Sequence, residues 1–329
     1  MQYIKEKASG FQLARISLGS ADFGGSTTES AAFRVMDAYI DRGGNFIDTA
    51  HVYADWIPGT HSSSEKIIGK WLRQSKKRDK MFIASKGAHP PLGDMGRSRM
   101  SASEIGEDIS EGLQFTGIDY FDLYYLHRDD PEMAVGEIME NANEQIKAGK
   151  TRALGCSNWK ADRIAEANRY CGQKGLTGFS ASQILYSLAE PNDEALTDKT
   201  MVRMSPCEYD FYISSDILLT AYSSQAGGFF TKVANNAPIS DDVKKAYFSQ
   251  TNNIIFKKAD EIAKKHGVSM TALALSYIYS QPFDSIAVIG CKTVEQVEDC
   301  LRHSDFMLQL ENVKLLNSLK SLNSICTTI

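Results

Sequence analysis

Short apolar runs alternate along the chain with longer segments that carry a single apolar stripe. After Ser101, for example, Ile105, Ile109 and Leu113 recur at i, i+4 and i+8, which places them on one face of a helix. The apolar runs are shorter and are bounded by polar or glycine-containing turns, as is typical of buried strands. They predict eight strands, at residues 16–20, 45–49, 81–86, 121–126, 151–156, 179–184, 216–222 and 285–289.

The segments between these strands have the length of helices. The amphipathic pattern predicts helices at about residues 29–42, 62–74, 134–148, 160–172, 253–266 and 270–280, with a further one beginning at 101. A less regular stretch, 190–214, contains one amphipathic segment. Strands that alternate with helices form right-handed βαβ units and a parallel sheet. Eight such units in a chain of this length favour an α/β fold of the (β/α)8 TIM-barrel type over a doubly wound sheet.

Both ends of the chain extend this basic pattern. Two short strands within residues 3–15 predict an N-terminal β-hairpin that would close the bottom of the barrel. Thr293 and Gln296 have the spacing of a capping box, so helical structure is expected to continue at the C-terminal end, after the last strand. Similar boxes begin at Ser62 and Ser101. No shift in composition and no Pro/Gly/Ser-rich linker divides the chain, which predicts one domain over residues 1–329.

Composition narrows the possible partners and the compartment. The net charge of −5 comes from interspersed acidic and basic residues, so the surface offers no basic patch for nucleic acid. The charged start of the chain does not resemble a signal peptide, and no apolar run is long enough for a membrane span. These features predict a cytoplasmic protein. The six cysteines include no C-x-x-C pair, which argues against a zinc site.

Reactive side chains stand at or just after the ends of three successive strands. Asp48 ends the second strand and Tyr53 follows five residues later; Lys86 ends the third strand and His127 follows the fourth. Since parallel strands of a barrel present their carboxyl ends on one face, these four side chains are expected to converge there. Each alone is compatible with packing or with a solvated surface, but their joint occurrence predicts an active site.

The four residue types form a coherent set for protonating an oxygen atom. A tyrosine normally has a pKa of about 10, too high for an acid that works near neutral pH. An ammonium from Lys86 beside the phenol of Tyr53 would lower that pKa, and Asp48 would keep the lysine charged and oriented. His127 would orient a carbonyl oxygen or relay the proton. The expected reaction is proton donation to an oxygen as hydride reaches the attached carbon.

Five segments, in order, resemble the aldo-keto reductase family. They are NFIDTAHVY (45–53), IASKG (83–87), YYLH (124–127), GCSNW (155–159) and AYS (221–223). The resemblance extends to about Arg302 and implies a (β/α)8 barrel that reduces an aldehyde or ketone with NADPH, or oxidises the alcohol. It also implies a catalytic tetrad of Asp48, Tyr53, Lys86 and His127.

The same resemblance implies where a nicotinamide cofactor binds, since no G-x-G-x-x-G motif supports a Rossmann site. Ser157, Asn158 and Gln183 match the polar residues that hold the nicotinamide carboxamide. Tyr222 matches the aromatic residue that stacks on the nicotinamide ring.

The phosphate end of the cofactor is expected just after the last strand. Gly290 and Lys292 precede the capping box of Thr293 and Gln296, so Lys292 lies at a helix N-terminus, which favours anions. Lys292 is expected to pair with an adenosine 2′-phosphate, which favours NADPH. Many family members have Arg there, a bidentate phosphate ligand, so NADH remains possible.

Substrate selection is expected from loops above the barrel rim. Phe23, Trp56 and Trp159 follow strand ends and are predicted to wall a pocket, to which Arg128 adds charge beside His127. This set suits a sugar-like or an aryl carbonyl compound, or the corresponding alcohol. The sequence leaves the oligomeric state open.

Two other functions are compatible with parts of the pattern. Some barrels of the family serve as cofactor-sensing subunits, as in the β-subunits of voltage-gated potassium channels, which bind NADP with little turnover. A metal-dependent barrel hydrolase would need clustered ligands at strand ends. Only His127 clearly lies at such an end, and His51 lies in a loop with no obvious partner ligands, so no metal site is predicted.

Overall fold

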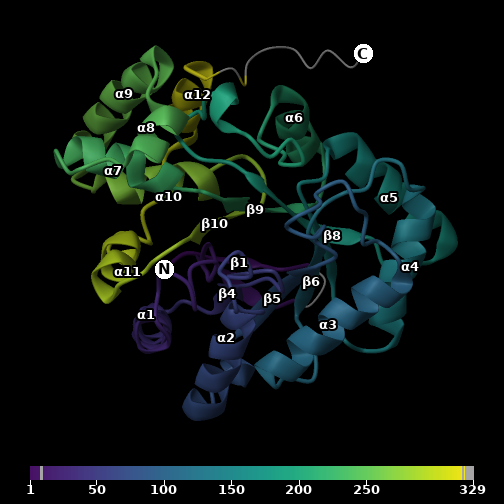
Figure 1. Cartoon of the computed structure of the whole chain (residues 1–329). Coiled ribbons are helices and arrows are strands. Elements are labelled where there is room, and N and C mark those ends of the chain that lie inside the picture. The colour runs from purple at the N-terminus through teal and green to yellow at the C-terminus, as the bar shows by residue number, and fades with distance from the viewer. Residues whose placement is uncertain (8–9, 321, 323–329) are drawn as a thin grey trace.

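A computed structural model describes residues 1–7, 10–320 and 322. Its barrel strands are β3 (Ile16–Gly19), β4 (Phe46–Asp48), β5 (Phe82–Gly87), β6 (Leu123–Leu126), β7 (Leu154–Ser157), β8 (Phe179–Leu185), β9 (Leu218–Tyr222) and β10 (Ser285–Ile289). All neighbouring pairs are parallel, and β10 pairs with both β9 and β3, so the barrel is closed. The prediction of a (β/α)8 barrel is confirmed (Figure 1).

Helices follow the strands and surround the barrel (Figure 1). They are α1 (Glu29–Asp41), α2 (Ser63–Ser75), α3 (Ala102–Thr116), α4 (Val135–Lys147), α5 (Ala161–Lys174), α6 (Pro206–Ser214), α7 (Phe229–Ala234), α8 (Asp241–Tyr247), α9 (Gln250–His266), α10 (Met270–Tyr279), α11 (Val294–Leu301) and α12 (Leu310–Ser318). The segment between β9 and β10 holds four of them, α7 to α10. Of these four the sequence pattern predicted only the last two, because α7 and α8 are too short to show a clear apolar period.

The serine N-cap of the capping box predicted at the start of α3 is confirmed. Ser101 Oγ accepts a hydrogen bond from the backbone N–H of Glu104 at 3.3 Å, and it donates to the Glu104 carboxylate at 2.6 Å. The helix ends at Gly117, whose φ of 67° suits a residue without a Cβ. Local sequence rules therefore define both ends of this helix.

The capping box predicted at the start of α2 is wrong. Ser62 has a φ of 47° and makes no side-chain cap; its hydroxyl donates instead to the backbone carbonyl of His51 at 2.7 Å. The Glu65 carboxylate accepts from Ser85 Oγ at 2.6 Å and faces His51 Nδ1 at 3.1 Å. Both side chains of the apparent box are used for tertiary contacts with buried polar groups, which compete with the local capping interaction.

The N-terminal hairpin lies against the apolar interior of the barrel. Its strands β1 (Tyr3–Lys5) and β2 (Gln12–Ala14) are antiparallel, and their buried Ile4 and Leu13 belong to the same apolar cluster as the barrel side chains Phe46, Phe82 and Leu123. A second, larger cluster lies between the strands and the outer helices. The predicted hairpin is confirmed, except that residues 8–9 at its turn lie outside the described residues.

Within the described part of the chain, no helix combines the length and the apolar character that a membrane span requires.

Candidate active site

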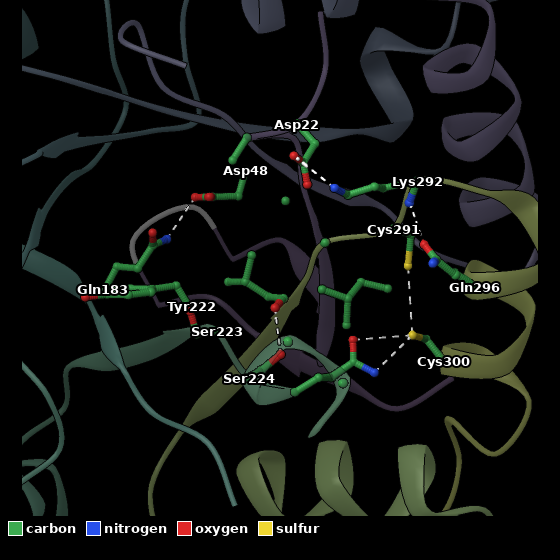
Figure 2. A pocket seen from close by; sticks show the side chains of 18 of the residues that line it. Asp22, Asp48, Gln183, Tyr222, Ser223, Ser224, Cys291, Lys292, Gln296 and Cys300 are labelled. Carbon is green, nitrogen blue, oxygen red and sulfur yellow. Dashed lines mark hydrogen bonds and ion pairs between the residues drawn. The ribbon is translucent and has the colours of Figure 1, made fainter. Parts of the chain in front are cut away.

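A cavity of about 850 Å³ lies at the carboxyl ends of the barrel strands. One end is lined by Asp48, Tyr53 and His127, and the other by Lys292 and Gln296. Figure 2 shows Gln183 and Tyr222 on one side of this cavity and the Lys292 region on the other, with Ser224 below. The cavity is thus lined at both ends by residues that the sequence assigned to a site.

Next to the first end of the cavity, the Lys86 amine bonds to three partners. Its Nζ donates to Asp48 Oδ2 at 2.7 Å, to the Thr49 carbonyl oxygen at 2.8 Å and to Tyr53 Oη at 3.0 Å. Burial by itself lowers the pKa of Lys86, but the charge and hydrogen bonds of Asp48 and Tyr53 outweigh burial and raise it. The amine therefore stays charged next to the phenol, as the sequence predicted.

Tyr53 differs from the expectation in the direction of its pKa. Burial raises the pKa of the phenol, and Lys86 offsets only part of that effect while Asp48 adds to it. The predicted effect of Lys86 has the expected sign, but burial outweighs it and the net pKa is raised, because the sequence shows which charges lie nearby but not how completely the phenol is desolvated. The neutral, proton-bearing form is the one that this surrounding stabilises.

His127 lies beside Tyr53, with the two ring centroids 6.0 Å apart. Its Nδ1 is buried and has no hydrogen-bond partner among the described residues. Burial lowers the pKa of His127 well below its ordinary value, and the neighbouring His89, Arg128 and Lys86 lower it further. A neutral imidazole can donate from one nitrogen and accept at the other, which suits it to hold a carbonyl oxygen.

Gln183, at the middle of β8, is tied to the first end of the cavity. Its amide nitrogen donates to Asp48 Oδ1 at 2.9 Å and lies 3.3 Å from Thr220 Oγ1. The second Asp48 oxygen is thereby occupied, since Oδ2 already binds Lys86. Asp48 is held from both sides, and the side-chain carbonyl of Gln183 is oriented by the same bond.

Asn158 connects the strand β7 end to Tyr222. Its Oδ1 accepts from Tyr222 Oη at 2.8 Å and from the Val202 N–H at 3.1 Å, and its amide nitrogen donates to Ser157 Oγ at 3.0 Å. Asn158 also has a φ of 61°, a left-handed conformation that asparagine tolerates better than most residues. The three predicted residues Ser157, Asn158 and Tyr222 are therefore brought together as one bonded group.

The second end of the cavity lies at the N-terminus of α11, after Gly290. Thr293 Oγ1 accepts from the Gln296 N–H at 3.4 Å, which confirms the cap, while Gln296 Oε1 accepts from the Lys292 N–H at 2.7 Å. The Lys292 amine lies 3.3 Å from Asp22 Oδ1 (Figure 2). It also lies 2.9 Å from Ser26 Oγ. A cation and a helix N-terminus thus adjoin each other here.

Of the four residues predicted for the substrate pocket, one lines the cavity, one is exposed beside Tyr53, and two are buried in the core. Arg128 lines the cavity, but its guanidinium is held by Asp198 Oδ2 at 3.1 Å and by the His127 carbonyl at 2.9 Å. Trp56 is 53% exposed, with its ring 6.3 Å from that of Tyr53. Phe23 and Trp159 are fully buried in the large apolar cluster and do not line the cavity. Sequence position after a strand end did not distinguish a rim residue from a core residue.

The structure adds residues that the sequence did not single out. Lys232 of α7 lines the cavity and donates to the Gly227 carbonyl at 2.9 Å. Gly227 and Gly228 have φ values of 64° and 77°, which let the loop after β9 turn next to the cavity. The two adjacent glycines after a strand could have indicated this turn from the sequence. Nothing in the local sequence of α7 indicated that Lys232 faces the same cavity.

The comparison with known proteins agrees with this arrangement. The Aldo/keto reductase family is matched over residues 15–321, so the chain belongs to the aldo-keto reductase family and is an oxidoreductase. Membership implies a nicotinamide cofactor in general and small carbonyl substrates.

Among the similar curated proteins are two from Bacillus subtilis. The "Uncharacterized oxidoreductase YrpG" is 27% identical over 327 residues, which cover 97% of this chain and 96% of the relative. The "Aldo-keto reductase YhdN" is 28% identical over 330 residues, with 97% and 93% covered. The "Aryl-alcohol dehydrogenase GME11368" of Pestalotiopsis microspora is 27% identical over 309 residues, with 92% and 76% covered.

Proposed function

We propose that the protein is an NADPH-dependent reductase of aldehydes or ketones, with Tyr53 as the proton donor. The observation that carries this proposal is the Lys86 amine, which is fully buried and bonded at once to Asp48 and to the Tyr53 hydroxyl. A buried charge with this geometry stabilises the phenolate that Tyr53 becomes after it gives up its proton.

In the proposed step the carbonyl oxygen of the substrate accepts a hydrogen bond from Tyr53, and the neutral His127 holds it in place. The carbonyl carbon would receive hydride from a reduced nicotinamide held in the cavity. Tyr53 transfers its proton to the oxygen, the carbonyl π bond breaks, and the alcohol forms. Lys86 then faces a phenolate, which regains a proton from solvent before the next turnover.

The donor set along the cavity fits a dinucleotide. Hydroxyl and amide groups of Ser157, Asn158 and Gln183 would hold the carboxamide, and the Tyr222 ring, fixed through its hydroxyl, would stack on the nicotinamide. At the other end Lys292 would pair with the 2′-phosphate, replacing its present contacts with Ser26 and Asp22. Gly290, Thr293 and Gln296 would supply or orient backbone N–H groups there.

The substrate class that we propose is an aryl or sugar-like carbonyl compound. The aromatic rings of Tyr53 and Tyr222 adjoin the reacting end, with Trp56 beside Tyr53 at the rim. Arg128 contributes charge on the same side, although Asp198 neutralises part of it. The relative named an aryl-alcohol dehydrogenase favours the aryl choice.

The experiment that tests this proposal follows NADPH absorbance with a panel of aryl aldehydes, ketones and keto-sugars. We expect turnover with at least one aryl aldehyde, and slower turnover with NADH at equal concentration. Tight binding of NADPH with no turnover across the panel would contradict the proposal and favour a cofactor-sensing protein.

A further inference from the structure

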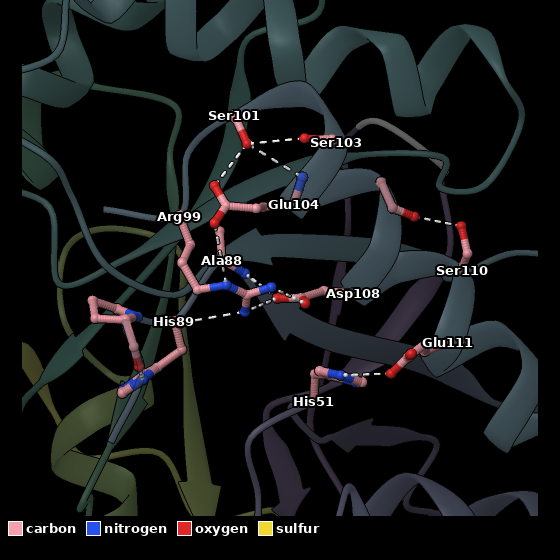
Figure 3. A network of polar contacts seen from close by, with 12 residues as sticks. His51, Ala88, His89, Arg99, Ser101, Ser103, Glu104, Asp108, Ser110 and Glu111 are labelled. Carbon is pink, nitrogen blue, oxygen red and sulfur yellow. Dashed lines mark hydrogen bonds and ion pairs between the residues drawn. The ribbon is translucent and has the colours of Figure 1, made fainter. Parts of the chain in front are cut away.

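A second group of titratable side chains lies outside the proposed active site. His51 and His61, near the two ends of the loop between β4 and α2, meet Glu111 of α3; one ligand atom from each of the three lies within 4.8 Å of the other two. The group borders a separate cavity of about 430 Å³, and the His61 and Glu111 side chains are each 50% exposed, so solvent reaches them. Figure 3 shows the His51 ring facing Glu111.

The two imidazoles present the same nitrogen to the same oxygen. His51 Nε2 lies 3.3 Å and His61 Nε2 lies 3.2 Å from Glu111 Oε2. Two ligand atoms that bind one tetrahedral zinc ion at about 2.0–2.1 Å are about 3.3 Å apart. The two observed N···O separations are compatible with ligands of one metal ion, as they also are with hydrogen bonds.

The other ring nitrogens are also occupied by carboxylates. His51 Nδ1 lies 3.1 Å from Glu65 Oε2, with Ser62 Oγ at the same distance, and His61 Nδ1 lies 3.2 Å from Asp55 Oδ2. A carboxylate that accepts from the far nitrogen of a histidine is the usual arrangement at metal-binding imidazoles, because it fixes the tautomer and orients the ring.

Hydrogen bonding alone would need both rings to carry a charge; burial by itself lowers the pKa of His51, but the hydrogen bond and charge of Glu65 outweigh burial and raise it, so metal binding has to be tested directly. Carboxylates only accept hydrogen bonds, so each imidazole would have to be doubly protonated to donate from both of its nitrogens. Two imidazolium rings would then lie with their centroids 5.1 Å apart. A divalent cation between the two Nε2 atoms and Glu111 leaves both rings neutral, with each Nδ1–H donated to its carboxylate.

The surrounding residues hold the rings without competing for Glu111. Phe115, one turn after Glu111 on α3, stacks on His51 and packs edge-on against His61, with ring centroids 6.1 and 5.6 Å away. Arg99 is engaged by Asp108 through two bonds of 2.7 and 2.8 Å (Figure 3). In the described part of the chain, the only basic groups within ion-pair distance of Glu111 are these two histidines.

We propose that His51, His61 and Glu111 bind a divalent transition-metal ion of the zinc class. Two imidazoles and one carboxylate suit such an ion, with water as a fourth ligand. The metal would join both ends of the loop that carries Tyr53 to helix α3, and so act as a clamp on that loop. The sequence showed no obvious partner ligand for His51, because Glu111 is separated from it by 60 residues and is brought near only by the fold.

Zinc titration of tag-free, chelator-treated protein tests the proposal. Wild type is expected to bind one Zn²⁺ with a dissociation constant of about a micromolar or below, and to gain thermal stability as it binds. His61→Ala and Glu111→Gln, both at half-exposed positions, should retain the fold and weaken zinc binding at least tenfold. Glu107→Gln, on the same helix and bordering the same cavity, and His303→Ala elsewhere should bind as wild type does.

Either of two results would overturn the proposed site. The first is no saturable zinc binding by wild type. The second is binding that survives unchanged in His61→Ala and Glu111→Gln. Because the measured quantity is metal binding and melting temperature, the result is independent of whether the protein reduces any carbonyl compound.

Discussion

Each end of the main cavity has a lysine, and the two lysines are held in opposite ways. Lys86 is completely buried and has three fixed partners within 3.0 Å. The Lys292 side chain is 46% exposed, and its two neighbours, Ser26 and Asp22, belong to a surface loop. A ligand anion can replace the contacts of Lys292, whereas the contacts of Lys86 are part of the folded core.

This difference implies different functions for the same side-chain type. Removing a cation from a buried pair leaves a desolvated carboxylate without compensation, which is costly. Removing a half-exposed cation costs little in the absence of its ligand, because water replaces it. Lys86 is therefore expected to matter for both chemistry and stability, and Lys292 for the choice of cofactor alone.

The largest effect is expected from Lys86→Met, a replacement of similar length without the charge. Turnover should fall by about 10²–10⁴-fold, because Tyr53 loses the cation that stabilises its phenolate. The free energy of unfolding should fall by about 3–5 kcal/mol, because Asp48 remains buried and unpaired. Steady-state kinetics and urea unfolding measure the two effects.

Lys292→Met is the matched control for stability. It should unfold within about 0.5 kcal/mol of wild type, as substitutions at exposed positions usually do. If both variants lost equal stability, the distinction between a core lysine and a ligand-binding lysine would be refuted.

At the Lys86 end of the cavity, the sequence could predict the positions of the side chains but not the net pKa of Tyr53. Asp48, Lys86 and His127 follow from position alone, because parallel strands in a barrel must present their ends together. The net pKa of Tyr53 could not be predicted, because it depends on how much water the fold removes from the phenol.

Contacts distant in sequence account for the remaining differences. The capping rule at Ser62 failed because His51 competes for the same hydroxyl, and Trp159 was assigned to the rim although it packs against Phe179 in the core. The hairpin, the barrel and the α3 cap were predictable because each depends on a local period or spacing.

A smaller effect is expected at the exposed end. Lys292→Met should weaken NADPH binding about tenfold, the loss expected for one charge-assisted contact, and leave NADH binding nearly unchanged. Fluorescence titration with each cofactor measures this. Lys232→Met removes the charge of another lysine that lines the cavity, and its NADPH and NADH affinities are compared with those of Lys292→Met. Equal losses for NADPH and NADH in Lys292→Met would rule out the 2′-phosphate contact.

The smallest effect concerns pH. Burial and neighbouring cations lower the pKa of His127, so the neutral imidazole predominates throughout the pH range above its ordinary value of about 6.5 and for some way below it. The kcat/KM profile should therefore show no inflection from His127 between about pH 6 and 8. A fall in kcat/KM through pH 6.5 that disappears in His127→Gln would show that His127 titrates normally.

The role of Tyr53 as the proton donor is tested by Tyr53→Phe, which removes one hydroxyl and keeps the ring. We expect this variant to bind NADPH with an affinity close to that of wild type, because the proposed cofactor contacts lie elsewhere in the cavity. Its turnover of an aryl aldehyde should fall by about 10²–10⁴-fold, since no proton donor remains at that position. Turnover at the wild-type rate would contradict the assignment of Tyr53 as the acid.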